Sequence, residues 1–179
     1  CYQQIPTRQV KVEDIVFLAP FICEKGESHK VQTILKENGQ AYDFIIASRY
    51  NGEWVRHAQG KVIVGLDDHA PLLQLEEIKN RCSIERKEFI QYEEDFSGSG
   101  AIITGPRWNN VQQVYVGDGE VLAHFSLPER FAADKDLYHF HPSLMDNAVN
   151  LAINTVSQDF YLPFTYRICK VYNTMPSRS

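Results

Sequence analysis

The sequence lacks the patterns that identify several common functional classes. Basic residues are outnumbered, with 18 Lys and Arg against 23 Asp and Glu, a formal net charge of -5, and they form no basic stripe. Nucleic acid is therefore not an expected partner, because its phosphates are neutralised by clustered positive charge. No GxGxxG or GxxxxGK[ST] pattern occurs, so nothing indicates a nucleotide cofactor.

Cysteine and long apolar runs are also scarce. The four cysteines are far apart and form no CxxC pair, which disfavours a zinc site and is typical of free thiols in a reducing compartment such as the cytoplasm. No apolar run approaches the roughly 20 residues that span a bilayer, and the first residues lack the charged and apolar regions of a signal peptide. We expect neither membrane insertion nor secretion.

The first third of the chain is predicted to form antiparallel strands. Residues 10–18, 30–37, 42–49 and 54–64 are rich in β-branched and aromatic residues. Asn38-Gly39 and Asn51-Gly52 separate the last three segments, and Asn-Gly is the typical dipeptide of a two-residue hairpin turn. The pattern indicates a meander of consecutive strands.

A second, similar region follows a change of pattern. Residues 65–81 are typical of a linker with a short helical turn, and 83–92 have helix-like spacing. Strands are predicted over 101–104, 111–116 and 121–127, with Gly117-Asp118-Gly119 as a turn, and a long helix over 141–157. Strand character returns at 162–164 and 168–172. We expect two sheets that each pack on a helix, although the first part contains no segment that predicts one.

Asp146 is the main candidate for chemistry. Asp146, Asn150 and Asn154 recur at four-residue spacing, so they share one face of the predicted helix. One interpretation is a solvated polar stripe, with Asp146 near the positive end of the helix dipole. The other is a general acid held in an apolar pocket. Spacing alone leaves both interpretations open.

Two other chemistries find less support in the sequence. His139 and His141 lie on one side of an extended segment, but no third ligand stands at a recognisable spacing, so no metal site is expected. No GxSxG pattern is present and no histidine lies close in sequence to a cysteine. A hydrolase triad is therefore not expected.

Several segments, taken in their order, resemble a known family. Thr104–Trp108 (TGPRW), His141–Asp146 (HPSLMD) and Leu162–Phe164 (LPF) are similar to the C-terminal half of dehydratase domains from modular polyketide synthases. Trp54–Gly60 (WVRHAQG) is similar to a strand of the family's first half. The resemblance covers nearly the whole chain.

This resemblance implies an α+β double hot-dog fold, in which antiparallel sheets wrap long helices. Residues 1–66 would form the C-terminal part of the first hot-dog subdomain, 67–83 the linker, and 84–179 the second subdomain, incomplete at its end. The family's first helix matches nothing in this chain. We expect that helix, with the catalytic histidine it accompanies, to precede Cys1 in a longer parent protein.

The resemblance also implies a reaction, the loss of water from a β-hydroxyacyl thioester to give an α,β-unsaturated one. The substrate would arrive on the phosphopantetheine arm of an acyl carrier protein, with no other cofactor. Neighbouring synthase domains are further expected partners, and relatives suggest a homodimer. The HPxLLD match makes Asp146 the acid, and the residues expected to contact substrate are Gly105, Pro106, Trp108, Pro142, Leu144 and Asn150.

The chain departs from the family pattern at three points. None of its six histidines is followed by glycine at the fourth and proline at the ninth position, so the family's HxxxGxxxxP base is absent. Thr104 replaces the tyrosine of a YGP pattern, and Asn150 replaces a Gln or His. The alternatives are therefore a noncatalytic scaffold or docking domain, or a relative that shifts a double bond or closes a ring.

Overall fold

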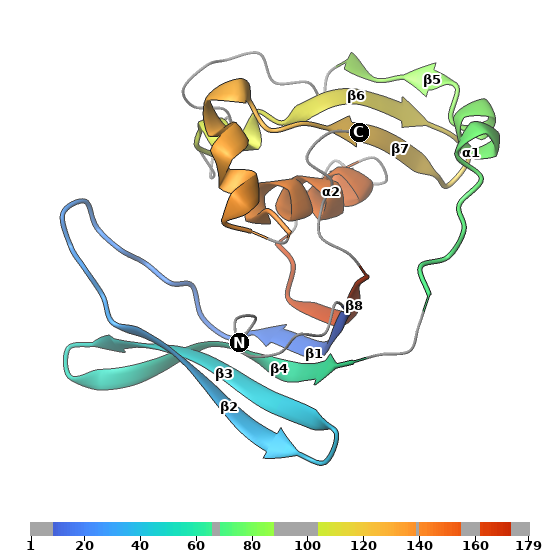
Figure 1. Cartoon of the computed structure of the whole chain (residues 1–179). Helices are drawn as coiled ribbons and strands as arrows, with labels where there is room; N and C mark the ends of the chain where they lie inside the picture. Colours follow the sequence, from blue (N-terminus) through green and yellow to red (C-terminus); the bar gives the residue numbers. More distant parts are fainter. Residues whose placement is uncertain (1–8, 66–68, 88–103, 139, 155–161, 173–179) are drawn as a thin grey trace. The chain divides into compact units, whose positions relative to one another are not determined.

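The computed structural model describes residues 9–65, 69–87, 104–138, 140–154 and 162–172 (Figure 1). The contacts between residues divide the chain into two compact units. The first consists of Cys1–Ala70 with Leu162–Thr174, and the second of Pro71–Tyr161 with Met175–Ser179. The two units are described separately.

The first unit is built on a five-stranded antiparallel sheet in the order β2-β3-β4-β1-β8. The four strands predicted in the first third of the chain are confirmed. The strands are β1 (Val10–Phe17), β2 (Val31–Asn38), β3 (Ala41–Tyr50), β4 (Glu53–Val64) and β8 (Thr165–Val171). The described residues of this unit include no helix.

Both predicted hairpins are present, and their turns have the backbone that Asn-Gly favours. Asn51 and Gly52 have φ values of 47° and 87°. Positive φ at both central residues matches the right-handed twist of the strands on either side. Gly39, in the turn between β2 and β3, has a φ of 63°. The local sequence therefore specifies the register of β2, β3 and β4.

The fifth strand joins the sheet from the far end of the chain. β8 pairs with β1 so that Val12 lies opposite Cys169. The predicted boundaries place this segment in the second subdomain, whereas its contacts are with the first unit. Periodicity predicts that the segment is a strand, but it carries no information about which edge the strand joins.

The core of the first unit centres on Phe44, which is 9% exposed on the third strand. Gly60 lies opposite it on β4. A Cβ atom at Gly60 would come within 2.8 Å of the Phe44 ring and 2.9 Å of the Glu13 carbonyl oxygen. The sheet needs glycine here because the aromatic ring occupies the space of a side chain.

The second unit has a three-stranded antiparallel sheet, β5-β6-β7. Its strands are β5 (Ile84–Glu85), β6 (Val111–Val116) and β7 (Val121–Phe125). Its helices are α1 (Leu75–Arg81), α2 (Pro142–Asn154) and the 3-10 segments η2 (Pro106–Trp108) and η3 (Glu129–Asp136). The strands predicted over 111–116 and 121–127 and the long helix are confirmed within the described residues.

The helix predicted over 83–92 is wrong in its described part. Ile84 pairs with Val116, and the Arg86 backbone N–H donates to the Val114 carbonyl at 2.9 Å. The edge of β6 offers a row of backbone groups for pairing, and this long-range pairing outweighs the local helix-like spacing. Residues 88–92 lie outside the described part of the chain, as do 101–103 of the predicted strand and 155–157 of the long helix.

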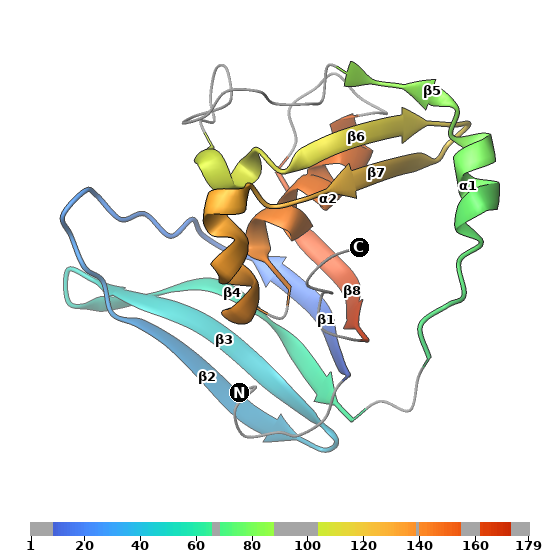
Figure 2. The same cartoon turned by 45° about the horizontal axis from the view of Figure 1, so that its top comes forward.

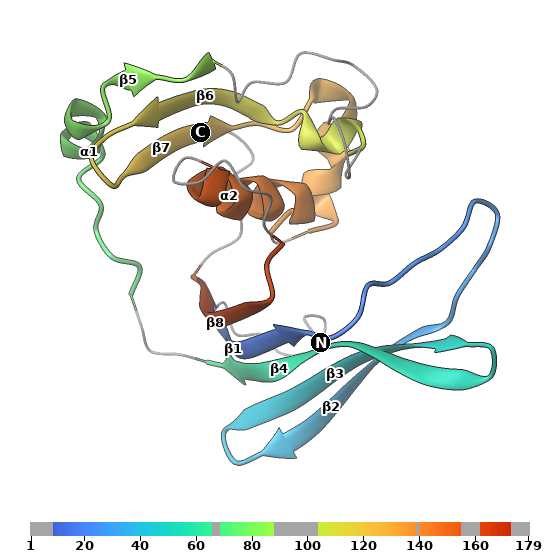
Figure 3. The same cartoon turned by 180° about the vertical axis from the view of Figure 1, so that it is seen from behind.

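Helix α2 packs on the sheet of its own unit (Figure 3). Val111, Val114 and Leu151 form a buried cluster, and Val114 is fully buried. Four partly buried residues of β6 and β7 surround it: Val116, Val121, Ala123 and Phe125. The apolar stripe predicted for the helix therefore faces the strands. No helix in the described part of the chain is long and apolar enough to cross a bilayer.

Replacing Gly60 tests the packing of the first sheet. Gly60→Ala should lower the free energy of unfolding by about 1–3 kcal/mol, because the added methyl group overpacks the Phe44 ring. Gly105→Ala is the matched control, since Gly105 has a φ of -76° and a Cβ atom there would have no neighbour within 4 Å. Urea denaturation measures both. Equal midpoints for the two variants would contradict this account of the core.

Candidate acid site at the start of helix α2

His141 caps the N-terminus of α2 with both its backbone and its side chain. The backbone N–H groups of Leu144 and Met145 each donate to its carbonyl oxygen at 3.1 Å. The Ser143 N–H donates to Nδ1 of the imidazole at 3.2 Å. Pro142 fits the first helical position because its missing N–H would have no helical partner there. A histidine thus provides the acceptors that the first turn of a helix needs.

Asp146 lies one turn further along α2, partly buried, with both carboxylate oxygens occupied. The Trp108 indole Nε1–H donates to Oδ2 at 2.7 Å. The Asn150 amide Nδ2 donates to Oδ1 at 3.0 Å. The predicted four-residue spacing therefore does bring Asn150 to Asp146, while the side chain of Asn154 is outside the described part of the structure. Asp146 and Asn150 on the polar face of α2 are thus bonded to each other, and Asp146 is bonded to Trp108 as well.

The turn that carries Trp108 is itself attached to α2. The Asn147 amide Nδ2 donates to the Trp108 carbonyl at 2.8 Å and to Asn110 Oδ1 at 2.9 Å. Asn110 is fully buried, and its Nδ2 donates to the Arg107 carbonyl at 2.9 Å and to Ser143 Oγ at 3.1 Å. These amides hold η2 against the first two turns of the helix. The distance between Trp108 and Asp146 follows from that attachment.

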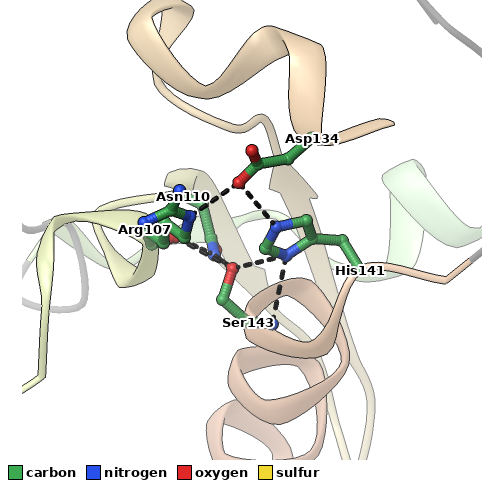
Figure 4. A network of polar contacts seen from close by, with 5 residues as sticks. All are labelled: Arg107, Asn110, Asp134, His141 and Ser143. Atoms are coloured by element: carbon green, nitrogen blue, oxygen red, sulfur yellow. Dashed lines mark hydrogen bonds and ion pairs between the residues drawn. The ribbon is translucent and has the colours of Figure 1, made fainter. Parts of the chain in front are cut away.

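The cap and the turn meet in one polar network (Figure 4). Asp134 Oδ2 accepts from Arg107 Nε at 2.6 Å and lies 3.4 Å from His141 Nε2. His141 Nδ1 lies 2.9 Å from Ser143 Oγ, which is also 2.9 Å from the Arg107 carbonyl. Ser143 is fully buried and His141 is 4% exposed. In Figure 2 the two 3-10 segments, η2 in yellow-green and η3 in orange, lie at the same end of the sheet.

Arg107 is the main cause of the electrostatics at Asp134. Its hydrogen bond holds the pKa of the Asp134 carboxyl below the usual range, and His141 lowers that pKa further. Asp134 in turn raises the pKa of the Arg107 guanidinium. The guanidinium also lies 4.2 Å from the centroid of the Phe131 ring, within cation–π distance. One carboxylate thus joins η3 to both η2 and the cap of α2.

The predicted substrate contacts divide into two groups. Trp108 and Asn150 touch Asp146 directly, and Gly105 and Pro106 begin the same turn as Trp108. Pro142 is exposed at the start of α2, and Leu144 is 7% exposed in the protein interior. Their contact with substrate stays a prediction.

Sequence reasoning missed much of this network. Asp134, Asn110, Ser143 and Asn147 were not candidates, and η3 was not predicted at all. The sequence signal that could have identified Ser143 and Asn147 was their position in the HPSLMD region: Ser143 lies within this segment and Asn147 directly follows it. Asp134 has no such signal, because its partners Arg107 and His141 are 27 and 7 residues away in sequence.

Three cavities lined by described residues have volumes of about 520, 310 and 420 Å³, and Asp146 lines none of these three. Within the same described part of the chain, no group of three His, Cys, Asp or Glu side chains gathers in a way that would hold a metal ion.

Comparisons with known proteins agree on one family. A family model described as the polyketide synthase dehydratase N-terminal domain matches residues 91–179. Polyketide synthase PksM of Bacillus subtilis (strain 168) is 27% identical over 184 residues, covering 96% of this chain and 4% of that protein. ThaG of Burkholderia thailandensis, also a polyketide synthase, is 28% identical over 176 residues, covering 93% of this chain and 3% of that protein.

Comparison with solved structures also finds polyketide synthase dehydratase domains. The solved dehydratase domain from the CurF module of curacin polyketide synthase is similar with a TM-score of 0.81 and 25% identity. The match covers 97% of this chain and 65% of that one. The predicted α+β hot-dog class is confirmed by this likeness. The chain spans less than two thirds of the solved domain and a few per cent of the curated relatives.

The pH dependence of stability tests the link through Asp134. Its lowered pKa means that the carboxylate stabilises the fold above the unfolded-state pKa of about 3.9, and that this contribution is lost as the pH falls through the lower folded value. Asp134→Asn should therefore be least stable relative to the wild type near pH 7, with the difference shrinking below about pH 4. Urea denaturation from pH 7 to pH 3 measures this.

The exposed neighbour Asp136 provides the matched control for that series. Asp136→Asn should change the stability little at either pH, because its side chain lies on the exposed side of η3. A stability difference for Asp134→Asn that stays constant or grows on acidification would contradict the proposed role of the Arg107 pair.

Proposed function

We propose that this chain, which is similar in sequence and fold to polyketide synthase dehydratase domains, takes part in removing water from a β-hydroxyacyl thioester. The product is the α,β-unsaturated thioester. The observation that carries the proposal is the Asp146 carboxyl, fixed by two N–H donors at the start of α2. The substrate class follows from the family.

Asp146 has the role of general acid in this proposal. Hydroxide is a poor leaving group, so the departing oxygen needs a proton as its bond to the β-carbon breaks. Asp146 supplies that proton, and water leaves. The α-proton goes to a base, and its electron pair forms the double bond beside the thioester carbonyl.

Trp108 and Asn150 orient the acid in the proposed reaction. Both contacts to the carboxyl are N–H donors, and neither donor can take a proton from it. The acidic proton must therefore point along a lone-pair direction that these two residues leave free. A carboxyl held in one orientation delivers its proton without first having to turn toward the substrate.

The base is not assigned to this chain. In the family a histidine in an HxxxGxxxxP motif takes the α-proton, and none of the six histidines here stands in that motif. His141 is committed to capping α2 and to Asp134. The proposal therefore assigns the acid half of the reaction to these residues.

The remaining expectations belong to the same proposal. An acyl carrier protein brings the substrate on its phosphopantetheine arm, and neighbouring synthase domains are further partners. The two units are proposed to represent the two hot-dog subdomains. Cys23, Cys82 and Cys169 are free thiols, which is consistent with a reducing compartment such as the cytoplasm.

Replacing the acid tests the function. Asp146→Asn keeps the size and the polarity of the side chain but cannot supply the proton, so dehydration should slow by about 10²–10⁴-fold. The assay follows loss of water by mass spectrometry, using a 3-hydroxyacyl carrier-protein thioester and the polypeptide that carries this sequence in the cell. Asp118→Asn, in the exposed turn between β6 and β7, is the matched control and should leave the rate unchanged.

Undiminished turnover of the Asp146→Asn variant would remove Asp146 from the mechanism. A wild-type polypeptide that binds the carrier protein but leaves its substrate unchanged would instead favour the noncatalytic docking role.

A second substitution separates orientation from proton supply. Trp108→Phe removes the indole N–H and keeps most of the ring. A hydrogen bond to a charged group contributes about 1.5–3 kcal/mol, so the dehydration rate should fall by about 10- to 100-fold. Trp54→Phe makes the same chemical change at a half-exposed position in the first unit and should leave the rate unchanged. A Trp108→Phe rate equal to that of the wild type would show that the carboxyl needs no such donor.

A further inference from the structure

A β-bulge in the first unit places His57 beside a buried serine. In the pairing of β3 with β4, Ala47 lies opposite Arg56 and Ile46 lies opposite Ala58, so His57 is the extra residue. A bulge turns the side chain away from the regular alternation of the strand, and such irregularities are common beside active sites. Here it brings His57 Nε2 to 2.7 Å from Ser48 Oγ.

The backbone around residue 19 fixes the imidazole in one orientation. His57 Nδ1 lies 3.2 Å from the Ala19 carbonyl oxygen. The His57 carbonyl in turn accepts from the N–H groups of Leu18 at 2.8 Å and Ala19 at 3.4 Å. A carbonyl can only accept, so we assign the ring proton to Nδ1. Nε2 is then left with the lone pair that faces the Ser48 hydroxyl.

Ser48 and His57 both line a cavity of about 420 Å³. Ser48 is 3% exposed, so it is reached from inside the cavity and not from the outer surface. Phe21, Ile22, Tyr50 and Val55 contribute apolar surface to the lining, and Glu24, Glu27 and His29 contribute polar groups. The Phe21 ring also packs edge-on against His57, with 5.3 Å between the ring centroids. The volume and the lining suit a short acyl chain.

We propose that Ser48 and His57 form a nucleophile–base dyad that accepts a short acyl group from a thioester. A nucleophile within hydrogen-bond distance of a base that a third group orients is the geometry of an activated serine. Ser48 Oγ attacks the thioester carbonyl while its proton passes to His57 Nε2. The carbon–sulfur bond then breaks, the thiol leaves with that proton, and Ser48 carries an ester.

The Ala19 carbonyl, which orients His57, limits the class of acyl donor that the dyad can use. The Ala19 carbonyl is a dipole and not a full negative charge, so it stabilises an imidazolium less than a carboxylate does. Such a dyad needs an acyl donor with a good leaving group. A thiolate meets that need and the amine of an amide does not. The reaction involves neither Asp146 nor the dehydration proposed above.

The experiment uses the full 179-residue chain, with the acetyl thioester of N-acetylcysteamine as acyl donor. Acylation is followed by intact mass, and the site is identified by peptide mapping. The wild type should carry one acetyl group on Ser48, and Ser48→Ala should carry none. His57→Gln keeps a hydrogen-bonding side chain that takes no proton, so its acylation should be at least about 100-fold slower, as for loss of a general base.

Two control variants define the site. Ser126→Ala removes an exposed serine outside the cavity and should be acylated at the wild-type rate. Asp146→Asn should also match the wild type, which separates this inference from the dehydratase proposal. Circular dichroism melting shows whether Ser48→Ala and His57→Gln remain folded. If either variant is unfolded, the residue that carries the acetyl group in the wild type tests the proposal instead.

Three results would overturn the proposal. The wild type remains unmodified at millimolar thioester, or His57→Gln is acylated as fast as the wild type, or the acetyl group maps to another residue. Exposed Cys23 is the obvious competitor, because a thiol exchanges with thioesters. A cysteine thioester is cleaved by neutral hydroxylamine, whereas a serine ester under the same mild conditions is not.

Discussion

The first turn of α2 determines the position of Asp146 in the second unit. A helix leaves the N–H groups of its first turn without helical partners, and burial makes each unpaired group costly. His141 accepts three of these N–H groups through its carbonyl and its imidazole. Because that imidazole is itself bonded to Asp134 and Ser143, the helix can start in only one place relative to η2 and η3. Asp146 is one turn from this fixed start.

The polar groups of the network depend on one another. Asn110 and Ser143 are fully buried, and a buried amide or hydroxyl that loses its partner costs more than an intact bond contributes. Asn110 donates to Ser143 and to the Arg107 carbonyl, and Ser143 lies within hydrogen-bond distance of His141. Any shift of η2 would therefore break several bonds together. This mutual dependence makes a short 3-10 turn a rigid support for Trp108.

Local sequence chemistry predicted the elements but not their long-range partners. Asn51-Gly52 gave the hairpin because a turn with positive φ is encoded by the two residues themselves, and the apolar spacing of α2 gave its buried face. The Asn150–Asp146 contact followed from helical spacing. The Trp108–Asp146 contact joins residues 38 apart, and no periodicity carries that information. β5 was predicted as helix for the same reason, since only the edge of β6 makes it a strand.

In each unit a departure from regular structure places the reactive side chain or its partner. Trp108 reaches Asp146 from a 3-10 turn, and His57 reaches Ser48 from a bulge. Regular strands and helices repeat their side-chain directions with periods of two and 3.6 residues, so they cannot aim one side chain independently of its neighbours. A residue in an irregular segment can direct its side chain independently of its neighbours, provided that hydrogen bonds hold its backbone. Asn147 does this for Trp108, and the paired bonds with Ala19 do it for His57.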